Sequence, residues 1–103
     1  MRKLTLMGNI GKDAEIKVTE KSNFITFSLA TQRYSKDSVL WVTCKKDRST
    51  ELAKYLTKGT KVLVQGNLNI REYESNGFKH FEVECQCDYI EFCAFPDSNN
   101  QLN

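Results

Sequence analysis

A regular alternation of apolar and polar side chains over residues 61–73 constrains the fold of this chain most strongly. Side chains of a β-strand point alternately to its two faces, so this pattern predicts a long strand with one buried face. The polar face ends in Arg71 and Tyr73. A bend or bulge is expected at Gly66, as a closing barrel would need. The expected buried face carries Val62, Val64, Gly66, Leu68 and Ile70.

A turn signal follows this strand at Ser75-Asn76-Gly77. Asn-Gly supplies the positive φ angles that tight hairpin turns require. Residues 81–89 then alternate again, which predicts a partner strand and a hairpin over residues 61–92, with an extended tip around residues 72–79. The expected buried face of the partner strand carries Phe81, Val83, Cys85, Cys87 and Tyr89.

Three further strands are expected upstream of the hairpin. Residues 24–33 and 39–45 alternate in the same way, and residues 2–18 carry a strand interrupted by Gly8 and Gly11. In the strand over residues 39–45, Trp41, Thr43 and Lys45 oppose the apolar side chains, so all three are expected on the outer face.

One helix is expected, over residues 49–57. Ser49 or Thr50 can cap its first turn, and Lys58-Gly59 can end it. The apolar stripe of this helix, which is expected in the core, carries Leu52, Tyr55 and Leu56. The order β-β-β-α-β-β predicts an all-β fold: a five-stranded oligonucleotide-binding (OB) barrel with one short helix between strands 3 and 4.

The length of 103 residues predicts one domain over residues 1–95 and a short polar tail over residues 96–103. The sequence has no run of 18 apolar residues, and its opening apolar run is too short for a signal peptide. No membrane partner is therefore expected, and a cytoplasmic location is the default expectation.

The charge of the chain is unevenly distributed. Residues 1–80 carry all 15 Lys and Arg against 8 acidic residues, whereas residues 81–103 carry 5 acidic residues and no Lys or Arg. This asymmetry predicts a basic face that could meet a polyanion. The alternative is that the charges intermix on the surface once the chain folds.

The sequence gives no sign of a metal, a cofactor or catalysis. Its four cysteines form no CxxC pair, and Cys85 and Cys87 are expected to be small buried hydrophobes. The alternative is a metal cluster of Cys85, Cys87 and Cys93 with His80. His80 is the single histidine and lies at the hairpin tip, and no P-loop or HExxH motif occurs. Asp13 and Glu15 are two residues apart and could share one face of a strand as an acid–base pair, but a solvated strand surface explains them more simply and is the expectation here. We expect a binding protein without cofactors rather than an enzyme.

Binding of single-stranded DNA requires cations for phosphates and flat side chains on which bases stack. The outward-facing positions and loops supply both. Each candidate has an alternative: Trp41 packs under a loop, Tyr73 packs across the hairpin, Phe78 tucks back onto the barrel, Tyr34 is only a strand-edge residue, and the cations are merely solvated. The candidate DNA-binding residues are Lys12, Arg33, Tyr34, Trp41, Thr43, Lys45, Arg48, Lys58, Arg71, Tyr73, Phe78 and Lys79.

Three segments, residues 8–16, 27–31 and 51–68, resemble bacterial-type single-stranded DNA-binding proteins in order and spacing. The resemblance implies an OB barrel that binds single-stranded DNA with little sequence preference in replication, recombination or repair. It also implies a homo-oligomer, usually a tetramer with a dimer as the alternative, paired through the first strand around residues 2–7.

The chain also departs from the family pattern. Trp41, Tyr73 and Tyr34 fit stacking positions, but Lys45-Lys46-Asp47-Arg48 replaces a fourth aromatic residue. Residues 97–103 show no acidic tip of the kind that recruits replication or repair enzymes, which indicates a short form or a trimmed chain. The alternatives to DNA protection are a primosomal-type OB protein that docks replication enzymes and a protein-interaction module that meets an acidic partner.

Overall fold

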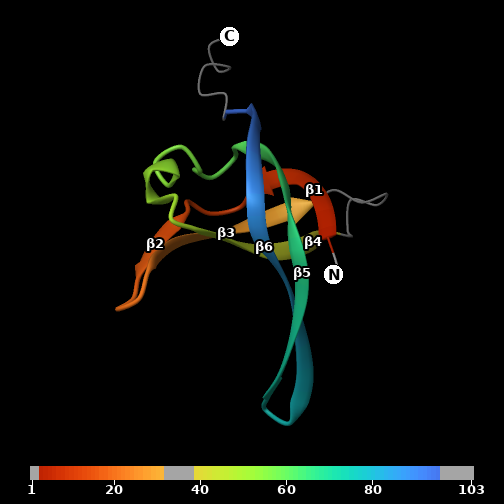
Figure 1. Ribbon diagram of the computed structural model, residues 1–103. Helices are drawn as coiled ribbons and strands as arrows, with labels where there is room; N and C mark the ends of the chain where they lie inside the picture. Colours follow the sequence, from red (N-terminus) through yellow and green to blue (C-terminus); the bar gives the residue numbers. More distant parts are fainter. Residues whose placement is uncertain (1–2, 32–38, 96–103) are drawn as a thin grey trace.

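The computed structural model describes residues 3–31 and 39–95. Within them, six strands follow one another along the chain, with a single 3-10 helix between the fourth and fifth strands (Figure 1). No helix in the described ranges is long and apolar enough to cross a membrane. The elements are β1 (Lys3–Ile10), β2 (Glu15–Val18), β3 (Asn23–Thr31), β4 (Leu40–Asp47), the 3-10 helix (Thr50–Leu52), β5 (Lys61–Ser75) and β6 (Phe78–Ala94).

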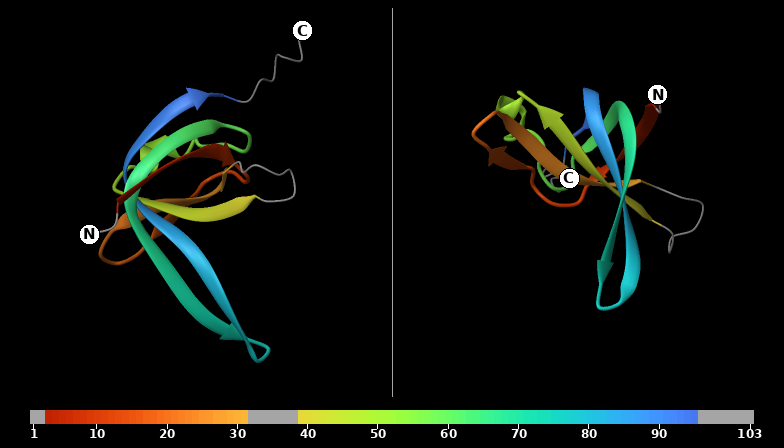
Figure 2. Two further views of the ribbon diagram at one scale, coloured as in Figure 1. Left: turned by 90° about the vertical axis from the view of Figure 1, so that its right-hand side faces the viewer. Right: turned by 60° about the horizontal axis from the view of Figure 1, so that its bottom comes forward.

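Five of the strands close into a ring. The sheet has the order β1-β5-β6-β4-β3-β2, and β1 also pairs with β3, so β1, β5, β6, β4 and β3 surround the core (Figure 2). All these pairings are antiparallel except that of β4 with β6. The short β2 pairs only with β3. Counted as one interrupted strand, β1 and β2 give the five-stranded OB barrel predicted from the sequence, with the helical segment in the predicted place.

The core fills the inside of this ring. The inward-facing residues of β3 and β4 alternate with half-buried or exposed neighbours, as the sequence pattern predicts. Leu56, which follows the 3-10 helix, covers one end of the core. The fully buried apolar side chains are Ile10, Ile25, Phe27, Leu29, Val42, Cys44, Leu56, Val62, Val64, Cys85 and Cys87.

A β-bulge sits where Gly66 was expected to bend the hairpin. Gln65 pairs with Tyr89 but Gly66 pairs with Cys87, so Asp88 is the extra residue. A side chain at Gly66 would place its Cβ 2.0 Å from the carbonyl oxygen of Gln86, which only glycine avoids. The bulge also reverses the faces of β6, so Tyr89 is exposed and Ile90 packs against the core. The prediction that Tyr89 is buried was wrong for this reason.

The predicted helix over residues 49–57 is much shorter in the structure. Only Thr50–Leu52 form a 3-10 helix, and the Ser49 side chain bonds back to Asp47 rather than capping it. With no continuing helix, Leu56 points into the core, whereas Tyr55 is half exposed and meets Phe92 edge-on. Placing Tyr55 in the core was therefore wrong.

The β5–β6 hairpin extends well beyond the barrel as an arm (Figures 1 and 2). Its tip is the two-residue turn Asn76-Gly77, in which both residues have positive φ, as the Asn-Gly signal predicts. Since no other strand of the described residues covers the arm, Ile70 and Phe81 are exposed, at 51% and 65%. Their predicted burial was wrong, because the apolar alternation continues past the point where the barrel ends.

Candidate nucleic-acid interface

The outward-facing side chains of β3 and β4 form a mixed polar and aromatic surface, which we call the outer face. The strand register sets Thr26 opposite Lys45, Ser28 opposite Thr43, and Ala30 opposite Trp41. These side chains alternate with buried ones, so the core holds their backbone in place. The outer face consists of Thr26, Ser28, Ala30, Trp41, Thr43 and Lys45.

The indole of Trp41 is both exposed and supported. Trp41 has 55% of its surface exposed, the largest exposure in β4 among the apolar side chains. Its ring lies against Gly11 in the link between β1 and β2, where a Cβ would come within 2.5 Å of the ring. Gly11 in turn donates its backbone N–H to the carbonyl of Ser28. The link therefore supports the ring and leaves part of it open, a geometry suited to stacking.

The hairpin arm joins the outer face through a charged network. Arg71 of β5 lies opposite Glu82 of β6, and its Nη2 is 2.5 Å from Glu82 Oε1. Arg71 Nε is 3.5 Å from Glu84 Oε2. The Thr43 hydroxyl on the outer face donates to the second oxygen of Glu82 at 2.8 Å. These contacts place Arg71 beside β4.

The pKa values of this network follow from its contacts. The guanidinium of Arg71 and the hydroxyl of Thr43 lower the pKa of the Glu82 carboxyl below its ordinary value. Glu82 in turn raises the pKa of Arg71. Arg71 is thus always cationic, and Glu82 stays ionised at neutral pH.

Beyond Arg71, the same face of the arm is aromatic. Tyr73 stacks on His80 with ring centroids 5.2 Å apart, and the Arg71 guanidinium lies 5.1 Å from the Tyr73 ring. The cross-strand alternative for Tyr73 is thus present in the structure, yet Tyr73 remains 43% exposed. Phe78 shares this face beside the turn and is 69% exposed. Lys79 lies on the opposite face, where it pairs with Glu72 at 3.5 Å.

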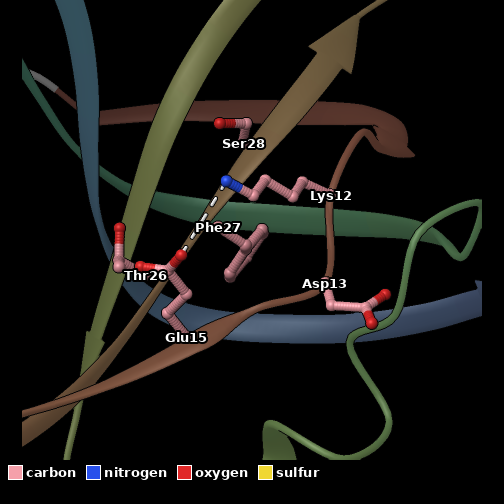
Figure 3. A pocket seen from close by; sticks show the side chains of 6 residues that line it. All are labelled: Lys12, Asp13, Glu15, Thr26, Phe27 and Ser28. Atoms are coloured by element: carbon pink, nitrogen blue, oxygen red, sulfur yellow. Dashed lines mark ion pairs between the residues drawn. The ribbon is translucent and has the colours of Figure 1, made fainter.

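Lys12 reaches over a small hollow at the other side of the outer face (Figure 3). The hollow, about 190 Å³ in volume, is lined by residues 12, 13, 15 and 26–28. Lys12 Nζ is 3.9 Å from Glu15 Oε2, while Lys17 is closer to Glu15 at 3.0 Å. The lysines, Lys17 above all, lower the pKa of Glu15. Lys12 is therefore only loosely paired.

Four further candidates are Lys58, which lines a hollow together with Gly11 and Lys12, Arg48 after β4, and Arg33 and Tyr34. Lys58 follows the 3-10 helix, and its backbone N–H donates to Asp13 Oδ1, which assigns Asp13 a structural contact. Arg48 directly follows β4, has a positive φ of 61° and lines a hollow beside residues 86–88. Arg33 and Tyr34 lie in the range 32–38, outside the described residues.

The sequence reasoning missed the acidic partners of the site. The alternation over residues 81–89 leaves Glu82 and Glu84 on the polar face of the last strand, but their pairing with Arg71 was not predicted. The sequence does contain the information for this pairing. If Asn76-Gly77 is a two-residue turn, Ser75 pairs with Phe78, and counting back along both strands sets Arg71 opposite Glu82. Lys3 also pairs with Asp88, so acidic residues of β6 neutralise cations from upstream strands. The charges intermix here, which is the second of the two alternatives drawn from the charge distribution.

The described side chains provide no group of three or more His, Cys, Asp or Glu suited to a metal ion. Cys44, Cys85 and Cys87 are buried, and Cys93 is exposed. Contact with the Cys44 thiol, together with burial, raises the pKa of Cys87 to about 12. The buried thiols thus behave as the small hydrophobes predicted from the sequence. The outer face instead combines the Trp41 ring with the hydroxyls of Ser28 and Thr43 and the cation of Lys45.

Comparison with known proteins identifies the family. The sequence profile described as the single-strand binding protein family matches residues 1–93. The chain belongs to this family. A single-stranded DNA-binding protein of Staphylococcus epidermidis is 32% identical over 98% of this chain and 82% of its own length. One from Rickettsia felis is 32% identical over 74% of this chain and 58% of its own length.

Two solved structures share the fold of this chain. The small single-stranded DNA-binding protein from Streptomyces coelicolor superposes with a TM-score of 0.78 at 20% identity, over 88% of this chain and 93% of its own. A structure described as Plasmodium falciparum SSB in complex with ssDNA gives a TM-score of 0.71 at 27% identity, over 90% of this chain and 95% of its own. The single-strand binding family therefore shares the OB fold described above.

Proposed function

We propose that this chain binds and protects single-stranded DNA with little sequence specificity, as a binding protein rather than an enzyme. The observation that carries the proposal is the exposed Trp41 indole, supported by Gly11 on the outer face of a single-strand binding family barrel. Relatives are named as single-stranded DNA-binding proteins, and one solved neighbour is a complex with ssDNA. Roles in replication, recombination or repair follow from the same family.

Two kinds of contact act together on the proposed surface. Bases stack on Trp41, and then on Tyr73 and Phe78 along the arm, because every base has a π-face that an aromatic ring can meet. Lys12 and Lys45 lie beside this path and bind phosphates. Thr43 supplies a hydroxyl at its centre. OB folds bind oligonucleotides on this sheet face and its flanking loops, which here are the β1–β2 link and the β5–β6 arm.

The assembly belongs to the same proposal. The β1 strand pairs with β5 along residues 3–9 but with β3 only at residues 8–10, so residues 3–7 leave one backbone edge without a neighbouring strand in the described chain. An open edge pairs readily with another strand. We therefore expect a homo-oligomer joined through β1, a tetramer or a dimer, located in the cytoplasm. The single domain over residues 1–95 contains the whole proposed surface.

Titration of Trp41 emission with poly(dT), combined with light scattering for mass, tests the proposal. Trp41 is the only tryptophan in the sequence, so the signal reports on one site. Stacking should quench the emission, and rising salt should reverse it. Duplex DNA is the control ligand, since paired bases cannot reach the ring. Unquenched emission from a folded oligomer would overturn the proposal and favour the protein-interaction module.

A further inference from the structure

Two carboxylates already contact Arg71, the candidate DNA-binding cation that lies where the arm joins the outer face. Glu82 contacts the Arg71 guanidinium at 2.5 Å, and Glu84 contacts it at 3.5 Å. The other oxygen of Glu82 accepts the hydroxyl hydrogen of Thr43 at 2.8 Å. A single carboxylate therefore holds two of the groups that a DNA phosphate would use.

We propose that Glu82 competes with DNA phosphate for Arg71 and Thr43, and that it thereby sets the affinity of this surface for single-stranded DNA. This inference rests on the proposed function, since it concerns the same surface. Carboxylate and phosphate bind the same fork of guanidinium N–H groups, so both cannot hold it fully at once. A phosphate that arrives beside Glu82 also meets like charge.

The exposure of the pair makes the competition accessible to a polymer from solution. The side chain of Arg71 is 55% exposed and that of Glu82 is 31% exposed. An exposed ion pair is weakly held and exchanges with other ions, unlike a buried one. DNA can therefore displace Glu82 at a cost in affinity, without unfolding the arm.

Glu15 and Glu72, the carboxylates paired with other candidate cations, have less favourable positions for competing with DNA. Glu15 is 3.9 Å from Lys12 and closer to Lys17, which is not among the DNA-binding candidates. Glu72 holds Lys79 on the face of the arm that points away from Arg71. Among the carboxylates of the described residues, Glu82 alone contacts both the arm and the outer face. Glu84 lies farther from Arg71, at 3.5 Å, so the effect is assigned chiefly to Glu82.

The experiment compares Glu82→Gln with wild type. Glutamine keeps the length of the side chain and a hydrogen-bonding oxygen for Thr43 but removes the charge. Affinity for labelled oligo(dT) is measured by anisotropy across a salt series. E82Q is expected to bind roughly three- to fivefold more tightly at about 0.1 M salt. Its slope of log K against log salt should steepen by about 0.7, the value of one added phosphate contact on a single strand.

Glu20→Gln is the matched control. Glu20 is exposed in the turn between β2 and β3, away from the arm, and its replacement changes the net charge by the same amount. If net charge alone mattered, E20Q would tighten binding as much as E82Q. A thermal melt of each variant verifies that it is folded.

Arg71→Gln in both backgrounds completes a double-mutant cycle. Because Glu82 occupies Arg71 in the wild type, R71Q should weaken binding more in E82Q than in the wild type. Equal losses in both backgrounds, a folded E82Q that binds no better than wild type, or an equal gain in E20Q would each overturn the inference. Failure of the wild type to bind oligo(dT) would instead overturn the proposed function, so the two failures are distinguishable.

Discussion

The ring of Trp41 can lie against the β1–β2 link because Gly11 has no side chain. One side of the indole lies against Gly11, so the β1–β2 link restricts its orientation before any ligand arrives. A fixed ring loses less conformational entropy on stacking than a mobile one. This makes Trp41 the residue whose removal should matter most.

Replacing Trp41 by Ala should weaken binding of oligo(dT) by about 1–3 kcal/mol, the usual value of one base stacked on an aromatic side chain. Replacing it by Phe should restore part of the loss. The measurement is anisotropy of a labelled oligonucleotide. Tyr55→Ala is the control, because Tyr55 is exposed to a similar degree but lies beside Phe92, off the outer face. Equal losses for Tyr55 and Trp41 would contradict the stacking assignment.

Acid should destabilise the fold partly through Glu82. Its pKa in the folded chain lies below the ordinary value of 4.5, so its contacts add stability above that value. The stability is lost as the pH falls through the lower, folded pKa. We expect the melting temperature of E82Q to fall less than that of wild type between about pH 5 and 3. Parallel falls for E82Q, E20Q and wild type would show that Glu82 contributes nothing.

At the scale of the elements, the sequence pattern located the strands well and their faces only in part. Alternation identifies a strand wherever one side is buried, and it placed the buried faces of β3 and β4 correctly. It has no means of detecting an extra residue in one strand of a pair. The bulge at Asp88 therefore exposed Tyr89 and turned Ile90 inward, although the bend at Gly66 itself was predicted.

The predictions for the helix and for the buried face of the arm were wrong for a related reason: both were made without knowing the tertiary contacts. Capping residues and an apolar stripe describe a helix that is favourable in isolation. In the fold, one short turn is enough to bury Leu56 and to pack Leu52 and Ala53 against the core. In the arm, Ile70 and Phe81 continue the apolar alternation, but no element within residues 3–31 and 39–95 covers them. At the site, residue types pointed to Trp41 and Arg71, whereas the acidic partner of Arg71 emerges only from the strand register.

The bulge provides a test at this scale. Gly66→Ala should destabilise the fold by about 3 kcal/mol, because its Cβ would collide with the backbone of β6 rather than with a movable side chain. Gln65→Ala, on the exposed neighbour, should change the stability by less than about 0.5 kcal/mol. Urea unfolding of both variants measures the difference. A G66A variant as stable as Q65A would mean that β6 can shift without cost.

At the scale of the whole molecule, the fold pairs the acidic last strand with basic segments upstream. The pair of Lys3 with Asp88 joins β1 near the start of the chain to β6, and the pair of Arg71 with Glu82 joins the two strands of the arm. Neither the net charge of +2 nor the basic charge of residues 1–80 measures the attraction of the folded surface for a polyanion, because part of the basic charge is paired with acidic residues. Local contacts rather than the total charge should govern DNA binding.

The number of phosphate contacts is open to direct measurement. If about four cations of each subunit neutralise phosphates, log K should fall with log salt at a slope of about −3. Poly(dT) titrations of the wild type at several salt concentrations supply this slope. A slope near zero would indicate that stacking alone holds the strand, and the cations on the surface would then have no part in binding.

The placement of the four thiols has a practical consequence. Cys44, Cys85 and Cys87 are buried in the barrel, whereas Cys93 is exposed near the end of β6. A maleimide dye should therefore attach to the unaltered protein at one defined point per subunit. With a second dye on the oligonucleotide, energy transfer would follow how the strand moves across each subunit, and mixing differently dyed subunits would report how fast they exchange partners.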